Sequence, residues 1–94
     1  MVLNVSKISG IGKFERKEEK ERDLYLKEGR TFLVVHKNTI EVRSDVRLMS
    51  VLKSKYESVM ESRYFGRGGL EIVLAGQLND REIEDLIRLS YNLT

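Results

Sequence analysis

The sequence predicts an α+β fold of one domain, residues 1–94: a two-layer sandwich of an antiparallel sheet and two α-helices. Segments 39–43 and 70–75 alternate apolar and polar residues, as half-buried strands do. Apolar residues recur at helical spacing over about 46–60 and 80–92. Because each amphipathic helix must bury one apolar stripe, we expect both helices on one face of about five to seven strands.

The N-terminal segment is expected to contain short strands and turns. Residues 2–5 are predicted to be a short strand, and the glycines of 9–12 indicate a turn. Residues 24–26 resume a strand. A turn at 27–30 follows, in which Gly29 suits a positive φ.

Between these strands, residues 15–23 are nine consecutive charged residues, five acidic and four basic. A helix is compatible with their propensities, but it would have almost no apolar face to bury. The run therefore predicts a solvated hairpin arm or an exposed strand. The alternative is a binding strip formed by the basic residues around it: Lys13, Arg16, Lys17 and Lys20.

The middle of the chain predicts a hairpin and a helix. Residues 31–36 are apolar on both faces, which is typical of a central strand, and 39–43 should pair with them across a short turn. Ser44 and Asp45 offer N-cap oxygens, so we predict a helix over about 46–60.

The last helix has the clearest local signal in the chain. Asn79 is an N-cap residue, and Glu82 lies three positions later, as in a capping box. Leu78 and Ile83 can form a hydrophobic staple at the same end. These residues predict a helix that begins at residue 80 and follows the strand at 70–75.

Composition excludes several classes of function. With no cysteine, the chain has no disulfide, thiolate nucleophile or cysteine-ligated zinc or iron–sulfur site. We expect a cytoplasmic protein, since no signal-peptide pattern, membrane span or disulfide is predicted. The net charge of +2 makes any basic surface local. Heavy use of Glu, Lys and Arg resembles thermophile composition.

The segment 62–70 is the one stretch that suggests a ligand surface, because arginine, aromatic and glycine residues cluster there. Arginines can contact phosphates, and aromatic rings can stack on bases. The alternative is structural: the two aromatic residues pack at the sheet edge and the glycines form a bulge. The predicted binding surface consists of Arg63, Tyr64, Phe65 and Arg67, together with Arg16 and Lys17.

Other chemistry is not supported by the sequence. Gly66 to Gly69 follow a helix and precede a strand, the reverse of a phosphate-binding loop. His36 is interpreted as a strand-end histidine, since no serine has the setting of a nucleophile. Glu82 and Asp85 share a helical face, but surface solvation explains them. We expect no metal, no cofactor and no enzymatic activity.

From residue 31 onward the chain resembles the MmcQ/YjbR family. The matching pieces are Arg30–Val35, Lys55–Val59, Gly69–Leu74 and Glu84–Leu93, in that order. The resemblance implies a helix-on-sheet domain with a terminal helix that ends in a Ser-Tyr pair, and it implies DNA binding. The family's N-terminal helix is replaced by strands here, and its Asn-Lys-x-x-Trp stretch by residues 64–68.

The strand-rich N-terminus followed by helices is also similar to small archaeal proteins with a TATA-binding-protein-like layout. Both resemblances imply the same two-layer fold. The expected function is a non-enzymatic binding or adaptor module, with nucleic acid as the first ligand to test. The alternative is a protein-interaction or homodimerisation domain in which Tyr64 and Phe65 are buried against a partner.

Overall fold

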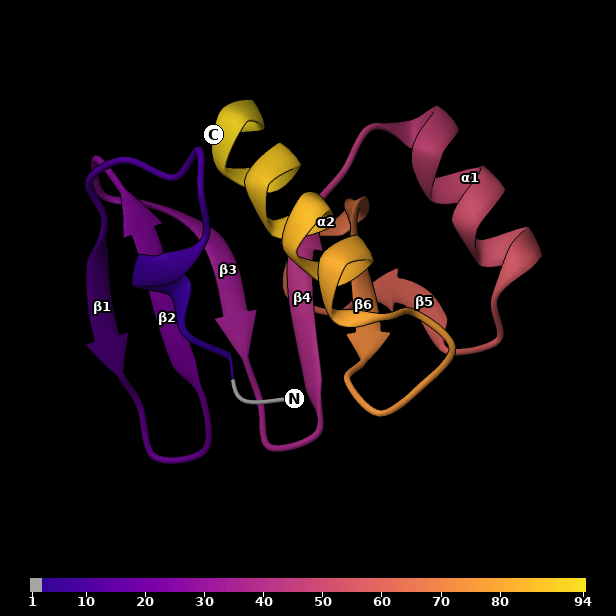
Figure 1. Ribbon diagram of the computed structural model, residues 1–94, viewed down its shortest axis with the longest axis horizontal. Coiled ribbons are helices and arrows are strands. Elements are labelled where there is room, and N and C mark those ends of the chain that lie inside the picture. Colours follow the sequence, from indigo (N-terminus) through magenta and orange to yellow (C-terminus); the bar gives the residue numbers. More distant parts are fainter. Residues whose placement is uncertain (1–2) are drawn as a thin grey trace.

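A six-stranded antiparallel sheet with helices packed against it forms the protein, as a computed structural model shows (Figure 1). The structure describes residues 3–94. The strands are β1 (Glu15–Glu18), β2 (Asp23–Lys27), β3 (Arg30–Val35), β4 (Thr39–Arg43), β5 (Val59–Ser62) and β6 (Gly66–Val73). Their order across the sheet is β1-β2-β3-β4-β6-β5. The predicted α+β class and antiparallel sheet are confirmed.

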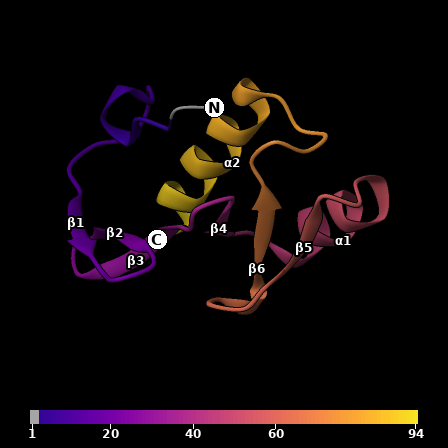
Figure 2. The same ribbon diagram turned by 90° about the horizontal axis from the view of Figure 1, so that it is seen from below.

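The helices α1 (Val46–Lys55) and α2 (Asp80–Leu93) share one hydrophobic core. α2 lies over β3 and β4, and α1 lies beside it against β5 and β6. Figure 2 shows α2 and the N-terminal segment on the same side of β1–β4. The core contains residues from both helices and from the sheet, among them Met49, Ile83, Ile87, Ile40 and Ile72.

The strand predicted at residues 2–5 is wrong for the part that the structure describes. Residues 3 and 4 are irregular, Val5–Lys7 is one turn of 3₁₀-helix, and residues 1 and 2 lie outside the described range. Val5 and Ile8 are both buried in the core. A 3₁₀ turn brings positions three apart onto one side, so it buries both residues where an alternating strand would separate them.

The charged run forms the exposed hairpin arm that its composition predicts. Every residue of β1 is exposed, and β1 pairs only with β2. Residues 19–22 form the turn, in which Arg22 bonds Glu19 at 2.7 Å. This charged strand at the sheet edge discourages pairing with another chain.

The helix predicted over 46–60 begins as expected but ends five residues early. Asp45 caps it by accepting a hydrogen bond from the Leu48 amide, and Tyr56 is already extended. Val59 then starts β5, a strand that the prediction missed. The Val59 side chain would face the same core whether residue 59 belonged to a helix or to a strand. The spacing of apolar residues alone therefore could not distinguish a longer helix from strand β5.

The capping box of the last helix is confirmed. The Asn79 side chain accepts from the Glu82 amide at 2.8 Å, and the Glu82 side chain accepts from the Asn79 amide at 3.1 Å. These bonds satisfy donors that the first helical turn leaves free. The helix presents Ile83 and Ile87, both fully buried, to the sheet.

Ser90 on α2 joins the helix to two strands. Its hydroxyl accepts from the Arg43 amide at 2.7 Å and donates to the Phe32 carbonyl at 2.6 Å. Regular pairing of β3 with β4 stops at Leu33–Val42, so these two backbone groups would otherwise lack strand partners. The serine hydroxyl therefore continues the sheet's hydrogen bonding from the helix.

Within residues 3–94, neither helix is long and apolar enough to cross a membrane.

Candidate functional site

Two buried carboxylates lie on the sheet face that points away from the helices. Strand register places Glu41 of β4 directly opposite Glu71 of β6. Glu41 is 1% exposed and Glu71 is 5% exposed. Two like charges in this position cost free energy unless each is paired and hydrogen-bonded. The surroundings of the two carboxylates therefore decide whether this part of the sheet is stable.

Glu41 receives three hydrogen bonds. Its Oε1 accepts from the Tyr64 amide and from the Ser62 hydroxyl, both at 2.8 Å. Its Oε2 lies 2.6 Å from His36 Nε2, and because a carboxylate only accepts, the imidazole donates. Burial acts to raise the pKa of Glu41, but the bonds from Tyr64, His36 and Ser62 together outweigh it, so this pKa lies below its ordinary value.

Glu71 is held by a cation. Arg63 Nε donates to Oε1 at 2.9 Å, and Arg63 Nη2 donates to Oε2 at 2.8 Å. Thr39 adds a third bond, from Oγ1 to Oε2 at 2.9 Å. The bond to Glu71 raises the pKa of Arg63 further above its usual range. Two parallel N–H···O bonds fix the arginine in one geometry.

The segment that carries Arg63 folds back over this face. The Tyr64 hydroxyl shares a hydrogen bond of 3.0 Å with Thr31 Oγ1 on β3. The Tyr64 and Phe65 rings meet edge to face, 4.9 Å between centroids. The Arg22 guanidinium carbon lies 5.3 Å from the Tyr64 ring centroid, and that of Arg43 lies 4.9 Å from the Phe65 centroid. The aromatic pair is thus enclosed between two arginines of the same chain.

Gly69 allows this segment to lie so close. A Cβ at Gly69 would be 2.6 Å from Phe65 Cβ and 2.8 Å from the Val42 carbonyl oxygen. At Gly68, in contrast, a Cβ would meet nothing within 4 Å. The glycine-rich run is part of strand β6, which begins at Gly66 instead of the predicted residue 70. One glycine in it is required by contact with the folded-back segment.

The predicted binding residues are divided between the two sides of the sheet. Lys17 shares the carboxylate face with Arg63, Tyr64 and Phe65, since register runs from Lys17 through Leu24 and Val34 to Glu41. Arg16 lies on the helix side, where it lines a hollow with Val5 and Tyr25 and bonds Asp23 at 2.8 Å. Arg67 is exposed and makes no ion pair within residues 3–94.

The sequence prediction missed the grouping of His36, Glu41 and Glu71. One ligand atom from each lies within 4.8 Å of the others, and these are residue types that bind zinc. The signal was the repeated apolar-Glu-apolar pattern of Ile40–Val42 and Leu70–Ile72, which places a glutamate in the middle of each strand. Arg63 already supplies a positive charge here, and protein donors satisfy every carboxylate oxygen.

The pair considered as metal ligands from the sequence is engaged elsewhere. Glu82 takes part in the capping box, and Asp85 bonds Arg88 at 2.6 Å.

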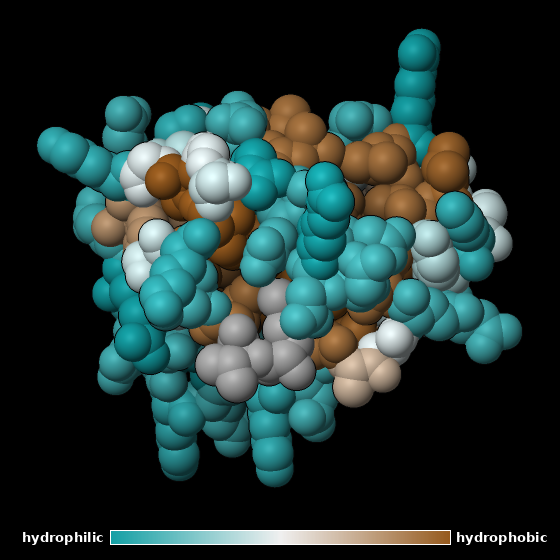
Figure 3. All heavy atoms as spheres, in the orientation of Figure 1, coloured by the Kyte–Doolittle hydropathy of each residue, from teal (hydrophilic) through white to brown (hydrophobic). Residues whose placement is uncertain are grey.

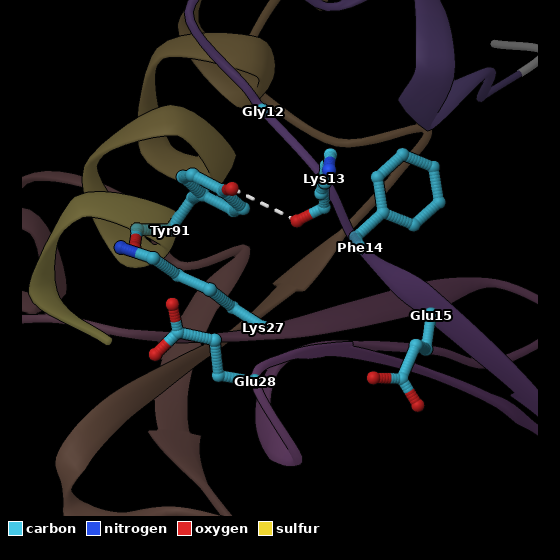
Figure 4. A pocket seen from close by; sticks show the side chains of 7 residues that line it. All are labelled: Gly12, Lys13, Phe14, Glu15, Lys27, Glu28 and Tyr91. Atoms are coloured by element: carbon cyan, nitrogen blue, oxygen red, sulfur yellow. Dashed lines mark hydrogen bonds between the residues drawn. The ribbon is translucent and has the colours of Figure 1, made fainter.

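A hollow lies between the N-terminal segment, the β2–β3 turn and the end of α2 (Figure 4). Its volume is about 650 Å³. The Tyr91 hydroxyl donates to the Lys13 carbonyl at 2.9 Å. Lys27 Nζ donates to the Tyr91 carbonyl at 3.1 Å and lies 4.5 Å from the ring centroid. These contacts fasten the N-terminal segment and β2 to the helix C-terminus, where a cation is favoured.

A second, more apolar depression lies between α1 and α2. Five leucines and two acidic residues line it, with a volume of about 270 Å³: Leu48, Leu52, Leu78, Leu86, Leu89, Glu82 and Asp85. Val51, which lies between the lining residues Leu48 and Leu52 in the sequence of α1, is 60% exposed. Figure 3 shows hydrophobic side chains gathered on the α1 side of the molecule. We call this depression, with Val51, the helix groove.

Comparison with protein families, with curated proteins and with solved structures finds no match for this chain. The resemblances to the MmcQ/YjbR family and to the archaeal TATA-binding-protein-like proteins therefore stay predictions.

Acid should weaken the carboxylate network. The pKa of Glu41 is lower in the folded protein than in the unfolded chain, where it is near 4.5. Ionised Glu41 therefore stabilises the folded protein at pH values above 4.5. This stabilisation is lost as the pH falls through the pKa of the folded state. We expect Glu41→Gln to cost about 1–3 kcal/mol at pH 7, because buried donors lose a charged acceptor. Denaturant titrations from pH 7 to pH 3 should show this difference shrinking.

The matched control is Glu61→Gln, an exposed glutamate of β5 without a side-chain hydrogen bond within residues 3–94. It should change stability by less than about 0.5 kcal/mol. A Glu41→Gln cost that stays constant down to pH 3 would contradict the proposed linkage.

Gly69 and Gly68 offer a test of the folded-back segment. Gly69→Ala should destabilise the protein by about 1–3 kcal/mol, since the added methyl group overlaps Phe65 and the Val42 carbonyl. Gly68→Ala should be nearly neutral. Thermal or denaturant unfolding measures both, and equal effects would show that the segment does not press on β6 in solution.

Proposed function

We propose that the protein is a non-catalytic protein-interaction module that binds its partner through the helix groove. The observation that carries this proposal is the unfilled apolar surface between α1 and α2, with Val51 standing exposed beside it. The carboxylate face is hydrogen-bonded to its own chain. The helix groove instead leaves Val51 exposed, and Leu48, Leu52 and Leu89 only partly covered.

The composition of α1 supports this proposal. Of its ten residues only Met49 is buried, while Leu48 and Leu52 are partly buried and Val46 and Val51 are exposed. A helix of ten residues has little stability of its own in water and depends on packing. A partner that covers Val51 and the leucines would bury apolar area and stabilise α1 at once.

The polar groups of the carboxylate face support a non-catalytic role. The single histidine donates to Glu41, and Arg63 is held at two points by Glu71. A general base or nucleophile needs a lone pair or proton directed at a substrate. Here each of these groups is directed at another side chain, so the arrangement serves folding.

Because the chain has no cysteine, one engineered cysteine can carry a photo-crosslinker at a single site. We expect a photo-crosslinker on Val51→Cys to form covalent adducts with protein. The adducts should appear in a lysate of the source cells, in the purified protein, or in both. The matched control is Met60→Cys, an exposed apolar position in β5. Its register partner Glu71 places it on the carboxylate face. No adduct above this control would overturn the proposal.

Nucleic acid is a second candidate ligand, favoured by basic groups on the carboxylate face. Arg63 is 75% exposed although Glu71 holds it, and Lys17 lies on the same face. Binding to phosphates through these groups would weaken steeply with added salt. The neighbouring Arg16 lies on the other side of β1 and provides a control.

Anisotropy of labelled 20-mers, single- and double-stranded, would measure this binding over a salt series. Lys17→Ala should reduce the slope of log K against log salt by about one unit, and Arg16→Ala should leave it unchanged. No anisotropy change at low salt would remove this candidate.

A further inference from the structure

We infer that the partner bound in the helix groove is a second copy of this chain, related by a two-fold axis that runs along the groove. This inference rests on the proposed function. Three features support it: the apolar stripes of the two helices, the distribution of charge between them, and the opposite directions in which they run.

The apolar residues form a stripe on each helix that runs from the core to the surface, with Leu86 buried, Leu48 and Leu52 partly buried and Val51 exposed. On α1 the stripe contains Leu48, Val51 and Leu52, which are three and four positions apart. On α2 it contains Leu86, Leu89 and Leu93, which follow one another at intervals of three and four positions. Leu93 is 49% exposed at its end. Two stripes of similar width allow one copy's α1 to lie on the other copy's α2.

The two helices carry opposite charge beside these stripes. α1 contains Arg47, Lys53 and Lys55 and no acidic residue. The α2 side of the groove is lined by Glu82, which takes part in the capping box, and by Asp85, which is exposed and bonds Arg88 of the same helix. Within residues 3–94, no ion pair involves any residue of α1. Lys55 Nζ lies 5.2 Å from the Tyr56 ring centroid, so the basic groups of α1 have no carboxylate partner among the described residues but Lys55 does contact an aromatic ring.

The directions of the helices decide which two-fold arrangement is favourable. α1 and α2 run in opposite directions (Figure 1), and Tyr56 at the end of α1 bonds Glu82 at the start of α2 at 3.5 Å. An axis along the groove stacks α1 of each copy on α2 of the other. It brings Lys55 over the first turns of the opposing α2, near Asp85 of the second copy.

The other two-fold arrangement is unfavourable. An axis across the helices stacks α1 on α1 in reverse direction, so that Arg47 meets Lys55 of the second copy. Like charges in contact oppose association, whereas opposite charges select the register of the complex. Charge thus favours the axis along the groove.

The size of this surface predicts a weak dimer. Helices of 10 and 14 residues, each about 10 Å wide with its side chains, form a face of roughly 20 by 20 Å, or about 400 Å² on each copy. Stable complexes bury about 800 Å² per partner, and weak ones less. We therefore expect a dissociation constant in the micromolar range, and a monomer at high dilution.

Sedimentation equilibrium between about 1 and 500 μM tests self-association. The mass should rise from 10.9 kDa toward twice that value. Val51→Glu should weaken association at least tenfold. The control is Val46→Glu, which changes an equally exposed valine on the far flank of α1 and should leave association unchanged. Circular dichroism confirms that both variants fold.

A charge exchange tests the axis. Lys55→Glu and Asp85→Lys should each prevent self-association, because each places like charges together twice across the two-fold axis. An equimolar mixture of the two variants should dimerise again, since both contacts then join opposite charges. Recovery in the mixture would be specific to contact between α1 and α2 of different copies.

The outcomes separate this inference from the proposed function. A chain that stays monomeric at 500 μM, while the label at position 51 still captures another protein, overturns the second copy and keeps the interaction module. A dimer that ignores Val51→Glu and the charge exchange uses another surface and overturns the inference. Absence of every adduct at position 51 overturns both.

Discussion

The structure depends on the pairing of Glu41 with Glu71 in neighbouring strands. Register forces the two carboxylates together, and burial makes their charge expensive unless each is compensated. Arg63 compensates Glu71, while the Tyr64 amide, Ser62 and His36 compensate Glu41. To supply these groups the β5–β6 connection must fold back over the sheet. The close contact at Gly69 and the aromatic pair between two arginines follow from that path.

Most of the fold could be predicted because its signals are local. The capping box at Asn79 and the alternation in β4 need only a few residues of sequence to be recognised. Val59 and Val5 are different cases. Each is apolar and buried, but burial fixes only the direction of the side chain, and a strand, a helix and a 3₁₀ turn can all provide it. The backbone conformation at Val5 and Val59 depends on contacts with residues that lie far away in sequence.

The candidate site shows the same limit. The cluster of arginine, aromatic and glycine residues near residue 65 was recognisable, but its purpose depended on Glu41 and Glu71, which lie on other strands. From sequence alone an arginine beside a tyrosine predicts a ligand surface as well as an internal cation–π contact. In the structure Tyr64 and Phe65 contact Thr31, Arg22 and Arg43 of the same chain, while Tyr64 remains 39% exposed, so the binding surface stays a prediction. Lys17 and Arg16 were separated because neighbouring strand residues face opposite sides.

The two faces of the sheet therefore differ in what they leave unsatisfied. On the carboxylate face, donors and acceptors are matched within the chain, so a ligand there would have to compete with contacts that stabilise the fold. On the helix side, apolar groups of α1 and α2 remain partly exposed, and the charges on α1 form no ion pair among residues 3–94. Binding on that side covers apolar groups and competes with few contacts, among them the bond between Asp85 and Arg88. Since association must offset the entropy of bringing two molecules together, a surface that loses few contacts on binding is the more favourable one.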